Sequence, residues 1–148
     1  MLEPISPATL SKALTIIKSF EGLRLKAYQD IGGRWTIGYG STGPGIEPGV
    51  TWTEIEALQR LQQDVQTFIQ GVMNLIKVPI SDNQLAALTS FAYNLGLPDL
   101  KRSGLLRLLN QGKYREASDQ FLLWDKVGSY TSDGLAKRRR AERTLFLS

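Results

Sequence analysis

Residues 19–41 read SFEGLRLKAYQDIGGRWTIGYGS, and this stretch carries two carboxylates and a hydroxyl in the pattern E-x8-D-x5-T. The three residues are Glu21, Asp30 and Thr36. Cleavage of a glycosidic bond needs one protonated carboxyl group, which donates to the leaving oxygen, and one ionised carboxyl group, which activates water or attacks the sugar. The pattern fits that chemistry. On the residues alone it fits equally well a turn capped by Asp30 and a strand that contains Thr36.

The residues before Glu21 predict an amphipathic helix. Ser6 and Pro7 are typical of a helix start. Apolar residues then recur at helical spacing at Leu10, Leu14, Ile17 and Phe20. Gly22 suits the end of this helix. Glu21 is therefore expected on the last turn, where the helix dipole is negative and a neutral, protonated glutamic acid is favoured over a carboxylate.

Residues 24–40 predict a short β-hairpin. Asp30, Gly32 and Gly33 are turn residues, and the β-branched and aromatic residues that follow suit a returning strand. A helix followed by a small sheet can place Glu21 and Asp30 on opposite walls of a groove. An inverting glycosidase would hold such carboxyl groups roughly 6.5–9.5 Å apart, with room for a water molecule between them. In that arrangement Thr36 could hold the water by its hydroxyl.

The remainder of the chain predicts helices. Thr53 with Glu56, and Ser81 with Gln84, form capping boxes before runs of apolar residues at helical spacing. Further helices are expected at about residues 105–112, 114–124 and 134–147. The sequence thus predicts an α+β fold in one domain over residues 1–148. A small mixed lobe would occupy about 20–52, and a larger helical lobe about 1–19 and 53–148.

The composition excludes several kinds of chemistry. The 148 residues include no cysteine and no histidine, which rules out disulfides, thiol nucleophiles, Ser-His-Asp triads and histidine-based zinc sites. The net charge of +4 favours an anionic partner such as a nucleic acid, a membrane surface or a bacterial wall polymer. Because no signal pattern and no apolar run of membrane-spanning length is visible, we expect a protein that starts in the cytoplasm without stable membrane insertion.

Three separated motifs resemble those of the phage-type lysozymes, the family of phage endolysins that cut bacterial peptidoglycan. The spaced Glu21, Asp30 and Thr36 fall on the catalytic array of that family, and QLAALTSFAYNLG, residues 84–96, resembles its central buried helix. The C-terminal part resembles the closing W…G…GL..RR..E pattern of the family through Trp124, Gly128, Gly134, Leu135, Arg138, Arg139 and Glu142. The resemblance runs from about Ile16 to the C-terminus.

The resemblance implies a lysozyme-like fold with a cleft between the two lobes and an inverting hydrolysis of the β-1,4 bond between N-acetylmuramic acid and N-acetylglucosamine. Glu21 would be the acid, Asp30 the base and Thr36 the water-holding residue, without a metal or cofactor. The resemblance further implies a monomer that waits in the host cytoplasm until lysis and then acts at the periplasm and cell wall. A holin-type membrane-permeabilising protein would release it, and no nucleic acid would be bound.

The family pattern also implies residues that contact substrate in the cleft, namely Tyr39, Thr42, Tyr93, Asn94 and Ser103. Many relatives carry a histidine after the Gly-Tyr-Gly segment, and this chain carries Ser41 there. Within the basic run at residues 137–140, Arg138 or Arg139 could point inward and pair with Glu21. The other basic residues of this run would face solvent.

Three alternative functions remain open on the sequence. A lytic transglycosylase on a related fold would need one catalytic glutamate and no water-activating aspartate, so Asp30 and Thr36 argue against it. A non-enzymatic basic module could bind nucleic acid or the cell envelope, although no nucleic-acid-binding signature is present. The basic terminal helix could also damage the envelope directly, in which case killing would survive the loss of Glu21.

Overall fold

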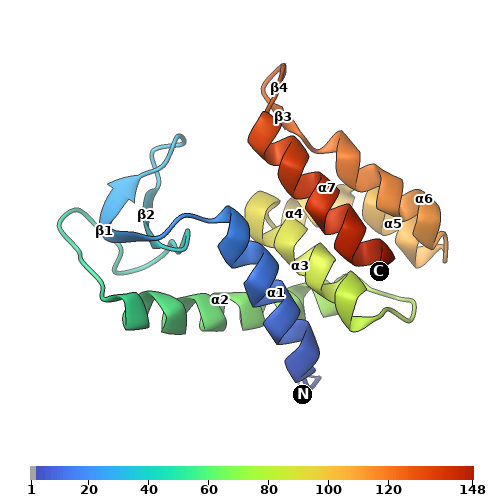
Figure 1. Ribbon diagram of the computed structural model, residues 1–148, viewed down its shortest axis with the longest axis horizontal. Helices are drawn as coiled ribbons and strands as arrows, with labels where there is room; N and C mark the ends of the chain where they lie inside the picture. Colours follow the sequence, from blue (N-terminus) through green and yellow to red (C-terminus); the bar gives the residue numbers. More distant parts are fainter. Residues whose placement is uncertain (1–2) are drawn as a thin grey trace.

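In the computed structural model, which describes residues 3–148, the chain begins with a helix that leads into a small β-hairpin and continues through a series of helices to the C-terminus (Figure 1). The elements are α1 (Pro7–Phe20), β1 (Arg24–Gln29), β2 (Trp35–Gly38), α2 (Glu54–Leu75), α3 (Asp82–Leu95), α4 (Leu97–Arg102), α5 (Gly104–Asn110), α6 (Tyr114–Gln120), the 3-10 turn η1 (Phe121–Leu123), β3 (Lys126–Val127), β4 (Tyr130–Thr131) and α7 (Asp133–Leu147).

Helix α1 forms as the sequence predicts. The Ser6 hydroxyl accepts a hydrogen bond from the backbone N–H of Ala8, and Pro7 is the first helical residue. The helix ends at Phe20, one residue earlier than expected. Glu21 follows as the C-terminal cap, with an extended backbone and its N–H bonded to the carbonyl of Ile17 at 2.9 Å. The candidate acid therefore stands at the joint between the helix and the hairpin.

The predicted hairpin is formed by β1 and β2, which pair antiparallel with Tyr28 opposite Thr36. Asp30 closes the turn in three ways: its N–H donates to the carbonyl of Arg34, its carbonyl accepts from the N–H of Gly33, and its side chain accepts from the N–H of Arg34. The predicted role of Asp30 as a turn residue is confirmed, and the turn fixes the direction of its side chain.

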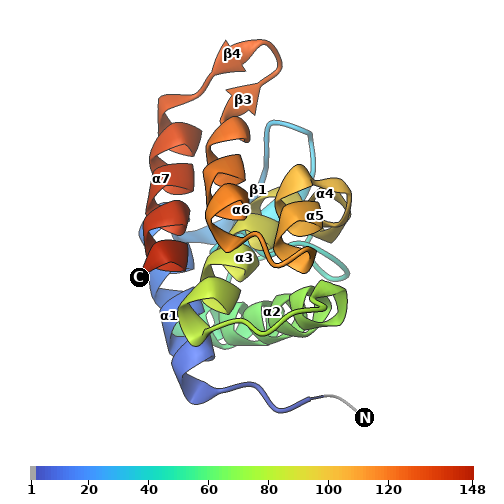
Figure 2. The ribbon, with the colours of Figure 1, turned by 90° about the vertical axis from the view of Figure 1, so that its right-hand side faces the viewer.

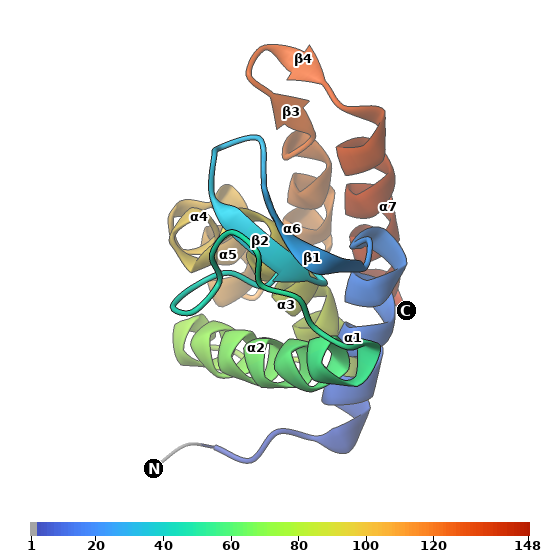
Figure 3. The same ribbon diagram turned by 90° about the vertical axis from the view of Figure 1, so that its left-hand side faces the viewer.

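The hairpin and the loop that follows it have a small hydrophobic cluster of their own. Ala27, Ile37 and Ile46 are buried there, and half-buried apolar side chains, including Trp35 and Trp52, pack around them. Figure 3 shows this hairpin in front, with α2 below it. The division into lobes at about 20–52 and at 1–19 with 53–148 stays a prediction.

Helix α3 is the centre of the helical part and contacts α1, α2 and α7 (Figures 1 and 2). Its residues from Leu85 to Ala92 are all buried, so this helix has no solvent-facing side over that length. The capping boxes predicted at Thr53 and Ser81 are both present and begin α2 and α3. A helix that is buried on all sides belongs to the core of the molecule.

Edge-to-face aromatic contacts link α3 to the C-terminal elements. The rings of Phe121 and Trp124 each lie 5.6 Å from that of Phe91, and Phe121 packs in the same way on Phe146. Such pairs add to the stabilisation that burial alone provides. Trp124 therefore packs against the core.

Two segments differ from the sequence-based expectation. The predicted helix at 114–124 ends at Gln120, continues as the 3-10 turn η1 and leads into a two-stranded hairpin, β3–β4. The Gly128-Ser129 pair between these strands is a hairpin signal, and Gly128 has the positive φ of +60° that its turn requires. Helix α4 is the second difference, because it is not among the helices that the sequence predicts. Within residues 3–148, none of the helices has both the length and the apolar character to span a membrane.

Candidate active site

Glu21 lies between α7 and the turn that follows β2. Its Oε2 accepts a hydrogen bond at 2.6 Å from Nη1 of Arg138 on α7, and its side chain is 21% exposed. On the other side is Gly40, where a Cβ atom would stand 3.1 Å from Oε1 of Glu21. The carboxyl group thus has one cation as a partner and one face closed by a glycine, while part of it still meets solvent.

Arg138 is itself held in a buried network. Its Nε lies 3.3 Å from Oε2 of Glu142, and its Nη2 donates to the carbonyl of Ser90 at 3.1 Å. Arg139 pairs with Oε1 of Glu142 at 2.7 Å and donates to the side-chain oxygen of Asn94. Of the two arginines that the sequence offered as partners of Glu21, Arg138 forms the pair. Arg139 is directed to Glu142 instead.

Burial is the main electrostatic influence on this network. It raises the pKa of the Glu142 carboxyl, and the charges of Arg139 and Arg138 and the hydrogen bond from Ser90 oppose that rise. Burial also lowers the pKa of Arg139, whose guanidinium group stands over the ring of Phe91 at 5.0 Å. Both carboxylate oxygens of Glu142 face guanidinium nitrogens, which is the geometry of an ionised and fully paired group.

A cavity of about 390 Å³ opens beside this network. Its walls come from the β1–β2 turn, the turn after β2, α2, and the end of α3. The lining residues are Asp30, Arg34, Gly40, Thr42, Asp64, Phe68, Tyr93, Asn94, Leu95 and Gly96. Asp30 therefore stands on the wall that the hairpin provides, and Gly40, whose Cβ position faces Glu21, belongs to the same cavity. Of the two predicted carboxylates, Asp30 lines this cavity, whereas Glu21 does not and lies beside it, next to Gly40.

Thr36 is placed less directly. It lies on β2 and is buried, and its hydroxyl donates to the carbonyl of Arg34 at 3.0 Å. It does not line the cavity, whereas Arg34, the residue that it binds, does. The side chain thus supports the turn that carries Asp30, and its oxygen keeps a lone pair for a further hydrogen bond.

Three of the five predicted substrate contacts, Thr42, Tyr93 and Asn94, line the cavity. Tyr39 is buried, and its backbone carbonyl accepts a hydrogen bond from the hydroxyl of Tyr93. Ser103 is also buried and caps α5, with its hydroxyl bound to the N–H of Leu106 and to the carbonyl of Leu100. Neither Tyr39 nor Ser103 is among the residues that line the cavity.

Asp64 and Phe68 are site residues that the sequence analysis missed. Both lie on α2, one turn apart, and both line the cavity. Asp64 binds Ser41 at 2.7 Å, and Phe68 packs edge-on against the ring of Tyr93 at 5.3 Å. Burial and the charges of Asp64 and Glu21 raise the pKa of Tyr93, so its hydroxyl stays a hydrogen-bond donor. On the sequence, the only signal was an acidic residue four positions after Arg60 on an amphipathic helix.

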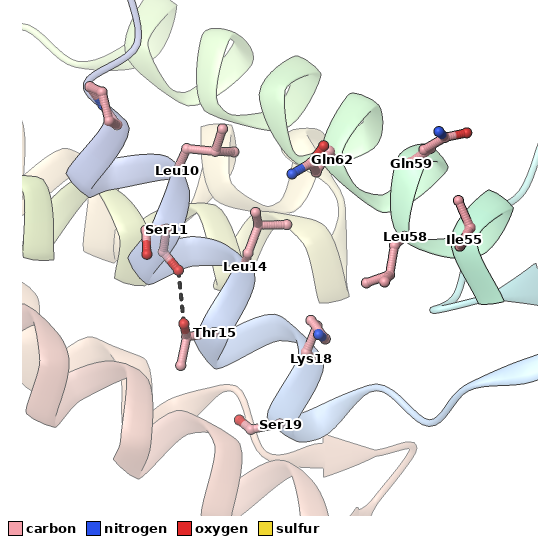
Figure 4. Close-up of a pocket in the computed structure, with 11 residues that line it drawn as sticks. Leu10, Ser11, Leu14, Thr15, Lys18, Ser19, Ile55, Leu58, Gln59 and Gln62 are labelled. Atoms are coloured by element: carbon pink, nitrogen blue, oxygen red, sulfur yellow. Dashed lines mark hydrogen bonds between the residues drawn. The ribbon is translucent and has the colours of Figure 1, made fainter.

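A second hollow of about 830 Å³ lies between α1 and α2. Figure 4 shows Leu14 of α1 and Leu58 of α2 pointing toward one another in it, with Lys18 and Gln59 at its edges. The described residues that line this groove include no carboxylate. The groove lacks the acid and base that glycosidic cleavage needs, so the cavity beside Glu21 is the candidate active site.

Known proteins resemble this chain over most of its length. The endolysin of Salmonella phage P22 is 42% identical over 142 residues, which cover 93% of this chain and 97% of that protein. The endolysin of Bacillus phage B103 is 47% identical over 137 residues, 91% of this chain and 52% of that protein. The chain therefore spans about half the length of the Bacillus phage endolysin that it matches.

Solved structures share the whole fold. The muramidase domain of SpmX from Asticaccaulis excentricus superposes with a TM-score of 0.86 at 36% identity, and the match covers 99% of each chain. A mutant of P22 lysozyme superposes with a TM-score of 0.79 at 37% identity, covering 99% of this chain and all of that one. The predicted lysozyme-like α+β fold is thereby confirmed. The sequence model described as phage lysozyme matches residues 18–142, and the chain belongs to the phage lysozyme family.

Proposed function

We propose that this protein is an endolysin that hydrolyses the β-1,4 bond between N-acetylmuramic acid and N-acetylglucosamine in bacterial peptidoglycan, with inversion at the anomeric carbon. The observation that carries the proposal is the ion pair between Glu21 and Arg138 beside a cavity that Asp30 lines. Relatives that share most of this chain are named endolysins, and one structural neighbour is a muramidase domain.

In the proposed reaction Glu21 is the general acid and Asp30 the general base. Glu21 gives its proton to the glycosidic oxygen as the bond to the anomeric carbon breaks. A water molecule on the other face of the sugar attacks that carbon, and Asp30 takes the proton that the water loses. The hydroxyl oxygen of Thr36 accepts a hydrogen bond from this water. Thr42, Tyr93 and Asn94 contact the sugar chain.

Arg138 has a role in the same step. Once Glu21 has given up its proton, its carboxylate needs a cation, and Nη1 of Arg138 stands 2.6 Å from Oε2. The pair seen in the structure places the guanidinium group where that carboxylate would need it. Glu142 and Ser90 bind the guanidinium group of Arg138 on its buried side, so its positive charge is in place before the reaction begins.

The basic C-terminal helix supports this proposal over direct envelope damage. Lys137 and Arg140 are exposed, whereas Arg138 and Arg139 are buried and face carboxylates. Two of the four basic residues at 137–140 are thus buried, and these two cannot bind an anionic polymer at the surface. The exposed half adds to the attraction of the protein to the wall.

The lifecycle is also a proposal. The protein waits in the host cytoplasm as a monomer, a holin-type protein permeabilises the membrane, and the enzyme then acts on the wall from the periplasm. Its relatives with endolysin names, among them the SAR-endolysin of bacteriophage PS119, support a role at lysis and leave the route of release to experiment.

Analysis of the products from purified peptidoglycan tests the proposed reaction. We expect hydrated reducing muramic acid ends, released first as the α-anomer. Mass spectrometry of the early products identifies hydrated or anhydro ends, and NMR identifies the anomer. Release of 1,6-anhydro ends would assign the chain to the transglycosylases, and no release would leave a binding module.

Replacement of Gly40 by alanine tests whether the turn closes the face of Glu21. The new Cβ would stand 3.1 Å from Oε1 of Glu21, which would displace the carboxyl group. We expect the variant to cleave peptidoglycan on the order of 10- to 100-fold more slowly. Gly45→Ala is the control, because Gly45 has the same φ of +84° as Gly40 but nothing within 4 Å of its Cβ position. The left-handed backbone should cost each variant about 1–2 kcal/mol in free energy of unfolding. Equal cleavage rates would contradict the prediction.

A further inference from the structure

We propose that Arg60 and Asp64 of α2 are positioning residues for the turn at residues 39–42, and that they act on catalysis by holding this turn against Glu21. The inference rests on the proposed function. It concerns residues that lie outside the pair of catalytic carboxylates and that bind the turn through hydrogen bonds to Ser41 and Thr42.

Two hydrogen bonds connect α2 to the turn, and a third joins the two α2 side chains that make them. Oδ2 of Asp64 accepts from the hydroxyl of Ser41 at 2.7 Å, and Oδ1 of Asp64 accepts from Nε of Arg60 at 2.9 Å. Nη2 of the same Arg60 side chain donates to the backbone carbonyl of Thr42 at 2.6 Å. Each carboxylate oxygen of Asp64 therefore accepts a hydrogen bond, and two consecutive residues of the turn, Ser41 and Thr42, are bound to the same helix.

Helix α3 holds the other end of the turn. The hydroxyl of Tyr93 donates to the carbonyl of Tyr39 at 2.6 Å. The turn is also closed on itself, because Ile37 and Ser41 exchange backbone hydrogen bonds at 3.0 and 2.8 Å. Gly40 stands between these attachments, and it is the residue whose Cβ position meets Oε1 of Glu21. The attachments therefore set the distance between the turn and the acid.

The residue types suit this role. The planar guanidinium of arginine binds a carboxylate through one nitrogen and a carbonyl through another, and the single ammonium of lysine cannot reproduce that geometry. The side chains of Arg60 and Asp64 are 28% and 22% exposed, and partly exposed ion pairs contribute little to stability. A small displacement of a catalytic group has a large effect on rate. The pair should therefore affect turnover more than stability.

The test compares Arg60→Lys and Asp64→Asn with a matched control, Asp119→Asn. Asp119 forms an ion pair with Arg143 at 2.8 Å that joins α6 to α7 away from the cavity. On solubilised peptidoglycan chains we expect kcat to fall on the order of 10-fold in both α2 variants and to stay unchanged in the control. Urea unfolding midpoints of all three should lie close together. A wild-type kcat in the α2 variants would overturn the proposal.

Amide hydrogen exchange tests the attachment of the turn without relying on the cleavage reaction, so it can fail or succeed independently of the proposed function. Faster exchange of the amides of residues 39–42 in Arg60→Lys than in Asp119→Asn supports the attachment. Equal exchange would overturn it, even if kcat fell. If the wild type cleaves no peptidoglycan, the proposed function fails, and the exchange data still report on the attachment itself. The double variant Ser41→Ala with Asp64→Asn should slow cleavage by less than the product of the two single effects.

Discussion

Glu21→Gln is expected to lower the rate of peptidoglycan cleavage by about 10²–10⁴-fold while the chain stays folded. Glutamine has the size of glutamic acid, and its amide oxygen can accept the hydrogen bond that Nη1 of Arg138 makes at 2.6 Å. It has no acidic proton to give to the leaving oxygen. The variant thus removes the acid and keeps the contacts around it.

The measurement is the release of reducing ends from peptidoglycan, with far-UV circular dichroism as the check on folding. Glu116→Gln is the matched control, because Glu116 is exposed on α6 and outside the cavity. It should cleave at the wild-type rate. If Glu21→Gln kept more than a few per cent of the activity, Glu21 would not be the acid.

The local elements around the site could be predicted from the sequence because their signals are short-range. A serine cap followed by proline, apolar residues at helical spacing and a glycine-rich turn are read within a few residues of one another. They placed Glu21 at the end of a helix and Asp30 in a hairpin turn, and the structure has both. The predicted distance of roughly 6.5–9.5 Å between the two carboxyl groups stays a prediction.

Helix α7 shows why other parts could not be predicted. Its buried residues are Arg138, Arg139, Glu142 and Phe146. A reading based on apolar periodicity places charged residues at the surface, so it could not assign the inward face of this helix. The choice between Arg138 and Arg139 as the partner of Glu21 depends on the angle at which α7 meets α1 and α3.

The contacts of Arg60 and Asp64 and the cap at Ser103 depend on tertiary geometry in the same way. Arg60 reaches the carbonyl of Thr42 across 18 positions of sequence, and no local pattern indicates that pairing. The family pattern implied Ser103 as a cleft residue, and it lies instead between α4 and α5. Once α4 and α5 are both present, the hydroxyl of Ser103 is needed at their junction.

Glu142→Ala is expected to lower the free energy of unfolding by about 3–5 kcal/mol, because it leaves two buried guanidinium groups without their carboxylate. Glu142 is 0% exposed and serves three donors: Arg138 at 3.3 Å, Arg139 at 2.7 Å and Ser90 at 2.6 Å. The unfolding temperature should fall on the order of 10 °C. Urea unfolding at neutral pH gives the free energy, and Glu116→Ala on exposed α6 should change it by less than about 0.5 kcal/mol.

The Glu142→Ala variant also tests whether Glu142 affects catalysis through the position of Arg138. Glu142 holds this arginine from the interior, and Glu21 meets it at the edge of the cavity. If Glu142 fixes the position of Arg138, the Glu142→Ala protein should also cleave more slowly at temperatures where it is fully folded. Glu142→Gln keeps an oxygen for Arg139 or Ser90 but removes the charge, so its loss of stability should be smaller. Loss of less than about 1 kcal/mol in Glu142→Ala would show that the two arginines find other partners or water, and that the network does not depend on this carboxylate.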